Sequence, residues 1–125
     1  LGYFTDEQID LITSFVEDQG LFKENPSSKK LKAFFNGTLK TPLIANHNGK
    51  VACFLNYLRD ELFLVYPWQK VIAEGQMICS KSTGKPLTRE NLKNALSSFK
   101  KTHDFKYPPF ETFVKQLKGK KEKEE

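Results

Sequence analysis

Apolar residues recur at helical spacing in several separate stretches of this chain, and this periodicity constrains its fold most. The most regular stretch places on one stripe Val51, Phe54, Leu55, Leu58 and Leu62. Such a stripe is the pattern of an amphipathic helix, and it predicts that Cys53, Asn56 and Asp60 lie on the opposite side. The same spacing predicts helices near residues 6–19, 50–62, 67–74, 88–101 and 109–118, and a short helix after Ser27 that ends at Asn36-Gly37.

Capping residues mark the ends of these helices. Thr5 and Gln8 have the spacing of a capping box, and Gly20 is a typical C-terminal stop. Thr88 is a good N-cap for the helix that carries Leu92, Ala95, Leu96 and Phe99 on its apolar stripe. We expect the core to contain Phe15, Phe54, Leu55, Leu58, Trp68, Leu92, Leu96 and Phe99.

Two stretches do not follow the helical pattern. Pro42 argues against a helix over residues 38–45, so we expect an extended segment there, and residues 76–80 suit either a short strand or a continued helix. The fold class is therefore mostly α, a single compact domain of about five to six helices with at most a small β element. We expect the domain to cover residues 1–117 and the charged residues 118–125, which include no apolar side chain, to be disordered.

The sequence lacks the signatures of a membrane protein or an enzyme. No apolar run approaches the ~20 residues that span a bilayer, and no signal peptide is visible. Its two cysteines, Cys53 and Cys79, have no spacing that favours a disulfide, so we expect reduced thiols in a cytoplasmic protein. Neither cysteine pairs with His47 or His103 at metal-ligand spacing. We therefore expect no catalytic residues, no metal and no cofactor.

One glycine-lysine turn invites comparison with a phosphate-binding loop. The turn runs Ser82-Thr83-Gly84-Lys85, but the loop motif needs a glycine five positions before the Gly-Lys pair and Ser or Thr after the lysine. Cys79 and Pro86 occupy those positions. The turn is therefore better interpreted as a polar surface loop.

Charge is distributed unevenly along the chain. The first 24 residues carry a net charge of −5, whereas the whole chain is +5. Residues 77–121 hold eleven Lys and Arg against three acids. Segregated charge of this size favours an anionic partner, either nucleic acid, in particular duplex DNA, or an acidic protein.

The best candidate for contact with that partner is the basic loop and helix of residues 81–101. We expect Lys81 and Lys85 to contact phosphates. The residues of the helix that we expect to contact the duplex are Arg89, Lys93, Asn94, Ser97 and Lys101. The alternative is that these lysines only keep the protein soluble, because a solvent-exposed lysine-rich helix without a partner has the same sequence pattern. Two further hypotheses are a helical protein–protein interaction module that docks an acidic partner through this basic face, and a homo-oligomer in which the acidic first helix meets the basic end of a second copy.

Aromatic residues offer a second way to bind nucleic acid. A stacking platform for single strands would use Tyr57, Tyr66, Trp68, Tyr107 and Phe110. Helical spacing, however, favours a core position for Trp68.

A resemblance to known proteins runs from Lys50 to Lys101. The residues that carry it are Val51-Ala52-x-Phe54-Leu55-x-x-Leu58, Trp68-Gln69-x-x-Ile72 and Gly84-Lys85-Pro86-Leu87-Thr88-x-x-Asn91-Leu92-x-x-Ala95. In these residues the chain resembles helical RteC-like regulators of Bacteroides-type conjugative elements. The resemblance covers under half of the chain and implies a DNA-binding, regulatory role on a mobile element.

Overall fold

The structure is a computed structural model that describes residues 4–61, 63–64, 67–103 and 106–124. Within these residues the chain forms six helices and two short strands. Their bounds are α1 (Asp6–Gln19), α2 (Ser28–Asn36), β1 (Leu43–Ala45), α3 (Asn48–Asp60), α4 (Trp68–Glu74), β2 (Ile78–Ser80), α5 (Arg89–Thr102) and α6 (Pro108–Glu124). The predicted mostly helical domain with a small β element is confirmed.

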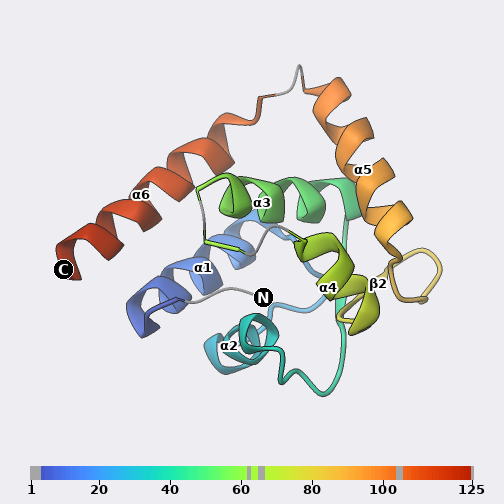
Figure 1. The fold of residues 1–125 in the computed structure, drawn as a ribbon, viewed down its shortest axis with the longest axis horizontal. Helices are drawn as coiled ribbons and strands as arrows, with labels where there is room; N and C mark the ends of the chain where they lie inside the picture. The colour runs from blue at the N-terminus through green and yellow to red at the C-terminus, as the bar shows by residue number, and fades with distance from the viewer. Residues whose placement is uncertain (1–3, 62, 65–66, 104–105, 125) are drawn as a thin grey trace.

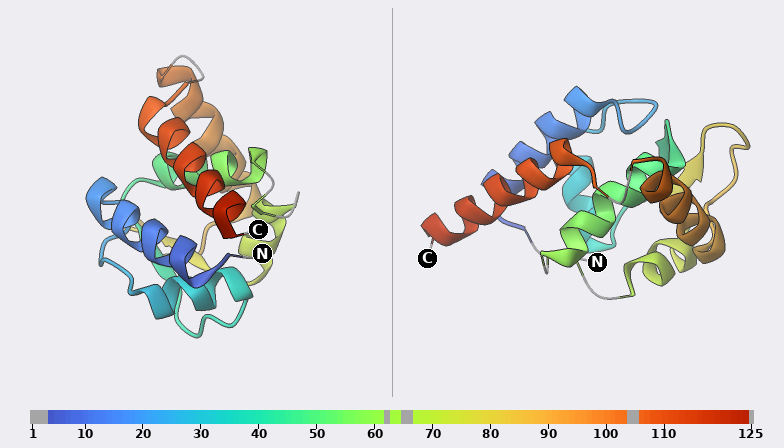
Figure 2. Two further views of the ribbon diagram at one scale, coloured as in Figure 1. Left: turned by 90° about the vertical axis from the view of Figure 1, so that its left-hand side faces the viewer. Right: turned by 90° about the horizontal axis from the view of Figure 1, so that it is seen from above.

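Helix α1 begins with the predicted capping box. The Thr5 hydroxyl accepts a hydrogen bond from the Gln8 N–H at 3.1 Å, and Gln8 Oε1 accepts one from the Thr5 N–H at 2.9 Å. Gly20 ends the helix with φ of 60°, a left-handed conformation that glycine adopts without strain. Gln8 is itself buried, and its side-chain N–H donates to the Leu117 carbonyl at 3.3 Å. This bond joins α1 to α6, which run side by side in both views of Figure 2.

Helix α3 lies at the centre of the molecule, with α5 on one side and α6 on the other (Figure 1). The sequence pattern places Cys53, Asn56 and Asp60 opposite the apolar stripe of this helix. Of these three residues Asp60 is exposed, whereas Cys53 and Asn56 are buried. A second helix, α5, covers that side of α3. Leu62 lies outside the described residues.

The two strands form a parallel pair, with Leu43 opposite Ile78 and Ala45 opposite Ser80. Single antiparallel bridges extend it on both sides, from Ala45 to Phe22 and from Cys79 to Pro86. The extended segment expected over residues 38–45 is a strand only in its last three residues. The strand alternative for residues 76–80 is confirmed over Ile78–Ser80.

The core is rich in aromatic rings. Phe15 stacks on Phe113 with ring centroids 4.0 Å apart, and Phe110 contacts Phe54 edge-on at 5.4 Å. Six of the eight predicted core residues are buried, whereas Phe15 and Leu96 are only partly covered.

Helix α6 continues to Glu124, and the last buried residue among those described on it is Leu117. The division into a domain over residues 1–117 and a tail over 118–125 stays a prediction. In the described part of the chain, no helix combines the length and the apolar character needed to cross a bilayer.

Candidate nucleic-acid interface

Helix α5 is held against the rest of the domain by one narrow side. Leu92 and Phe99 are buried, Ala95 and Leu96 are partly covered, and the helix contacts α3 and α4. Thr88 caps its first turn, because the Thr88 hydroxyl accepts from the Asn91 N–H at 3.0 Å and Asn91 Oδ1 accepts from the Thr88 N–H at 3.1 Å. The remaining sides of α5 therefore face solvent.

The structure places all seven predicted site residues on the surface. Each of Lys81, Lys85, Arg89, Lys93, Asn94, Ser97 and Lys101 is exposed. Helical periodicity puts Asn94, Ser97 and Lys101 on the stripe farthest from the buried Leu92. Arg89 and Lys93, four residues apart, lie on one flank of that stripe. The set therefore forms one surface along α5, with Lys81 and Lys85 on the loop before it.

Internal hydrogen bonds hold the loop of residues 81–86 to β2. The Gly84 N–H donates to the Ser80 carbonyl at 2.8 Å, and the Lys85 N–H donates to the Thr83 hydroxyl at 3.2 Å. Gly84 has φ of 69°, which suits glycine. Because these two N–H groups already have partners in β2 and in the loop, they do not form the open cradle of backbone donors that a phosphate-binding loop presents.

The positive charge of this surface is not neutralised by neighbouring acids. Across the described residues, none of Lys81, Lys85, Arg89, Lys93 and Lys101 forms an ion pair. Glu90 is the single acid in residues 81–102. The acidic helix α1 lies on the other side of α3 (Figure 1). The acids of α1 thus lie away from α5, whereas α1 contacts α6, which carries four other lysines of the basic stretch.

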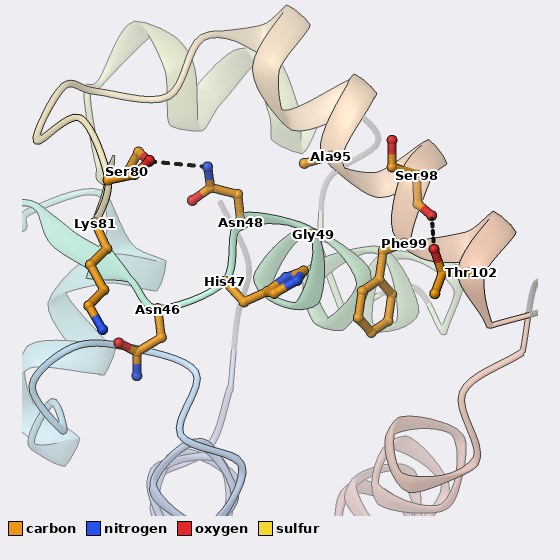
Figure 3. A pocket seen from close by; sticks show the side chains of 11 residues that line it. Asn46, His47, Asn48, Gly49, Ser80, Lys81, Ala95, Ser98, Phe99 and Thr102 are labelled. Carbon is orange, nitrogen blue, oxygen red and sulfur yellow. Dashed lines mark hydrogen bonds between the residues drawn. The ribbon is translucent and has the colours of Figure 1, made fainter.

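A groove of about 680 Å³ lies beside α5 (Figure 3). Helical periodicity puts Arg89 and Lys93 on the opposite flank of that helix. The groove lies between the start of α3, the end of β2 and the side of α5 that carries Ala95, Ser98 and Thr102. Asn48 Nδ2 donates to the Ser80 hydroxyl at 3.2 Å, which links α3 to β2 across its floor. Of the predicted site residues only Lys81 lines this groove.

Sequence reasoning missed the groove, although one signal was present. The polar run Asn46-His47-Asn48-Gly49 predicts a turn with Asn48 as the cap, whereas the structure makes His47 the N-cap of α3. His47 Nδ1 accepts from the Lys50 N–H at 3.1 Å. These four residues therefore both turn the chain and line one wall of the groove.

Of the cysteines and histidines, Cys53 and His103 line one small cavity together with Asp60. Both cysteines are free and buried. Burial raises the pKa of the Cys53 thiol to about 11, with a smaller lowering effect of Lys100, so the thiol is protonated at neutral pH. His103 packs on Phe99, and its Nδ1 lies 2.9 Å from the Phe99 carbonyl. In the part of the chain that the structure describes, no group of His, Cys, Asp and Glu side chains is placed to hold a metal ion.

The four described members of the predicted aromatic platform do not form an exposed surface. Trp68 and Phe110 are buried, as helical spacing favours for Trp68, while Tyr57 and Tyr107 are half-buried. The Tyr57 hydroxyl accepts a hydrogen bond from the Tyr107 N–H at 2.9 Å. Tyr66 lies outside the described residues.

Comparisons with known proteins assign no family. No protein-family model matches the chain, and no curated protein or solved structure is significantly similar to it. The resemblance of residues 50–101 to RteC-like regulators stays a prediction.

Proposed function

We propose that this protein is a DNA-binding regulatory domain that contacts the duplex through α5 and the loop before it. The observation that carries the proposal is the exposed, un-neutralised basic surface of residues 81–101. A 14-residue helix is roughly 21 Å long, and the major groove of B-DNA admits an α-helix that is covered on one side only. Helix α5 has that form, because its buried stripe is narrow.

The side chains of this surface suit the two kinds of contact that a duplex offers. Lys81, Lys85 and Arg89 supply charge for phosphates, which fix the position of a protein on DNA. Asn94 and Ser97 carry neutral donors and acceptors on the outermost stripe, where base edges would be met. The proposal extends to a cytoplasmic protein that acts as a regulator, and the resemblance to RteC-like proteins favours a mobile element as its setting.

Binding to random-sequence duplex at two salt concentrations tests the proposal. Arg89→Ala, Lys93→Ala and Lys101→Ala should each weaken binding, and each phosphate contact removed should flatten the slope of log affinity against log salt by about 0.9. The matched control is the triple variant Lys23→Ala/Lys29→Ala/Lys40→Ala. It removes the same formal charge from exposed lysines that lie outside residues 81–101.

The two triple variants separate specific contact from general charge. The proposal requires that the Arg89/Lys93/Lys101 triple loses much more affinity than the control triple. Equal losses, or no binding by the parent protein at low salt, would exclude it. A protein–protein module that docks an acidic partner would then be the better account of the basic face, and sedimentation of the parent alone would reveal a homo-oligomer. If a preferred sequence is found, Asn94→Ala should reduce discrimination by roughly 1–3 kcal/mol.

A further inference from the structure

The side chain of Asn56 is buried in the middle of the domain without a hydrogen-bond partner among the described residues. Asn56 is 6% exposed and lies on α3. In the same part of the chain, every side-chain N or O atom that is fully closed off from solvent has a partner. Burying an unpaired amide costs free energy. Asn56 lines two small cavities.

One of these cavities is surrounded by positive charge. It has a volume of about 190 Å³ and lies between α3, the first turn of α4 and the first residue of α5. We call it the Asn56 pocket, and its polar and aromatic lining comprises Asn56, Arg59, Trp68, Gln69, Lys70 and Arg89. Arg59 donates to Asp60 at 2.9 Å, so this pair is close to neutral. Lys70 and Arg89 leave a net charge of about +2 at the pocket.

The second cavity has a different character. It is smaller, about 140 Å³, and its lining includes Asp60 and the Cys53 thiol besides Lys100 and Lys106. The Asp60 carboxylate in its lining opposes the binding of an anion there. The Asn56 pocket is lined by donors and cations from three separate elements, and no carboxylate is among its described lining residues.

We propose that the Asn56 pocket binds a phosphate group. Asn56, Lys70 and Arg89 line the pocket from α3, α4 and α5. Their side chains can donate to different oxygens of one anion, which suits a tetrahedral anion better than a planar carboxylate. The charge also matches, because a phosphomonoester carries about −1.5 to −2 at neutral pH. Pockets for drug-sized ligands measure about 300–1,000 Å³. The Asn56 pocket is smaller, so it holds a phosphate group rather than a whole nucleotide.

This inference does not rest on DNA binding, although Arg89 belongs to both surfaces. Its first test uses inorganic phosphate against chloride at constant ionic strength. Trp68, the one tryptophan of the chain, lines the pocket and serves as a fluorescent reporter. Calorimetry of the same titration provides a signal that does not depend on Trp68. We expect saturable binding at millimolar phosphate or below.

Three variants and one control locate the binding site. Asn56→Asp keeps the shape of the side chain but adds a negative charge, and Lys70→Gln and Arg89→Gln each remove a positive one. Each should weaken phosphate binding tenfold or more. Lys70 and Arg89 are exposed, so their variants test the pocket even if Asn56→Asp unfolds the domain. Lys29→Gln, on α2, should bind phosphate as the parent does.

The outcomes either support or overturn the inference. Absence of both heat and fluorescence change in the parent overturns it, as does unchanged affinity in the Lys70 and Arg89 variants. A second titration compares a 5′-phosphorylated oligonucleotide with its 5′-hydroxyl counterpart. Tighter binding of the phosphorylated strand that Lys70→Gln abolishes assigns the phosphate to a DNA end. If the protein binds inorganic phosphate but binds the two strands equally well, the ligand of the pocket is a free phosphate or a small phosphoester. Duplex binding without phosphate binding would refute the pocket and leave the DNA proposal intact.

Discussion

Helices α3 and α5 approach closely at Gly49, and adding one methyl group there tests the packing that presents α5. A Cβ atom at this position would lie 2.9 Å from the Ala95 carbonyl oxygen and 3.0 Å from the Phe99 Cβ. Non-bonded carbon atoms pack best at about 3.5–4.0 Å. The first of these atoms is in the backbone of α5 and the second is bonded directly to it. Neither can rotate away, so the clash is relieved only if α5 moves away from α3.

The size of the effect follows from two opposing contributions. Forcing a methyl group into a packed interface typically costs about 1–3 kcal/mol. Alanine is favoured over glycine by up to about 1 kcal/mol within a helix, and by less at the second residue of α3. Gly49→Ala should therefore lower the free energy of unfolding by about 1–2 kcal/mol, which is a fall in Tm of roughly 3–8 °C for a domain of this size.

Gly119→Ala provides the matched control. This substitution is also in a helix, and a Cβ at Gly119 would meet no atom within 4 Å. It should leave stability unchanged or raise it by up to about 1 kcal/mol. Thermal and urea unfolding followed by circular dichroism measures both variants. If Gly49→Ala proves as stable as the parent, α3 and α5 do not pack as described, and the positions of the α5 surface and its groove would have to be revised.

Two further predictions concern burial and capping. The raised pKa of Cys53, from 9.0 to about 11, means that the folded state holds its proton more tightly. The protonated thiol therefore stabilises the fold fully below pH 9, and this stabilisation, roughly 2 kcal/mol, is lost as pH rises through 11. The free energy of unfolding of Cys53→Ala should fall less steeply between pH 9 and 11 than that of the parent. Identical pH profiles of the two proteins would contradict the assignment. Thr88→Ala removes the α5 cap and should cost about 1 kcal/mol in urea unfolding, whereas the exposed Thr38→Ala should cost nothing measurable; equal effects would refute the capping role.

The helices could be predicted from the sequence because their signals are local. The capping pair Thr5 and Gln8 indicates the start of one helix, and Thr88 before an apolar stripe indicates the start of another. Both caps form as expected. The exposure of the candidate residues was equally predictable. Polar and charged side chains on the sides of α5 away from Leu92 and Phe99 have nowhere to be buried, and Lys81 and Lys85 lie on a polar loop. What they bind is not specified by that pattern.

The features that were missed depend on contacts between distant segments. Periodicity places Cys53 and Asn56 opposite the apolar stripe of their helix, but it does not reveal whether a second helix covers that side. The absence of a side chain at Gly49 lets α5 pack closely on α3. A single glycine near the start of a helix does not predict such a contact from sequence. The Asn56 pocket likewise joins residues from α3, α4 and α5, so no single stretch of sequence contains its pattern.

The short strand pair has a consequence for how the domain opens. Its hydrogen bonds join segments far apart in the chain: the Leu43 amide donates to the Met77 carbonyl, and the Asn46 amide just beyond β1 donates to the Leu21 carbonyl, both at 2.9 Å. Fraying of a single helix end leaves such bonds intact. The hydrogen of the Leu43 amide should therefore exchange with solvent only when the first and second halves of the chain separate, and that of the Asn46 amide only when the end of β1 leaves the segment after α1. Their exchange rates would report cooperative unfolding, while amides at the ends of α5 would report local motion.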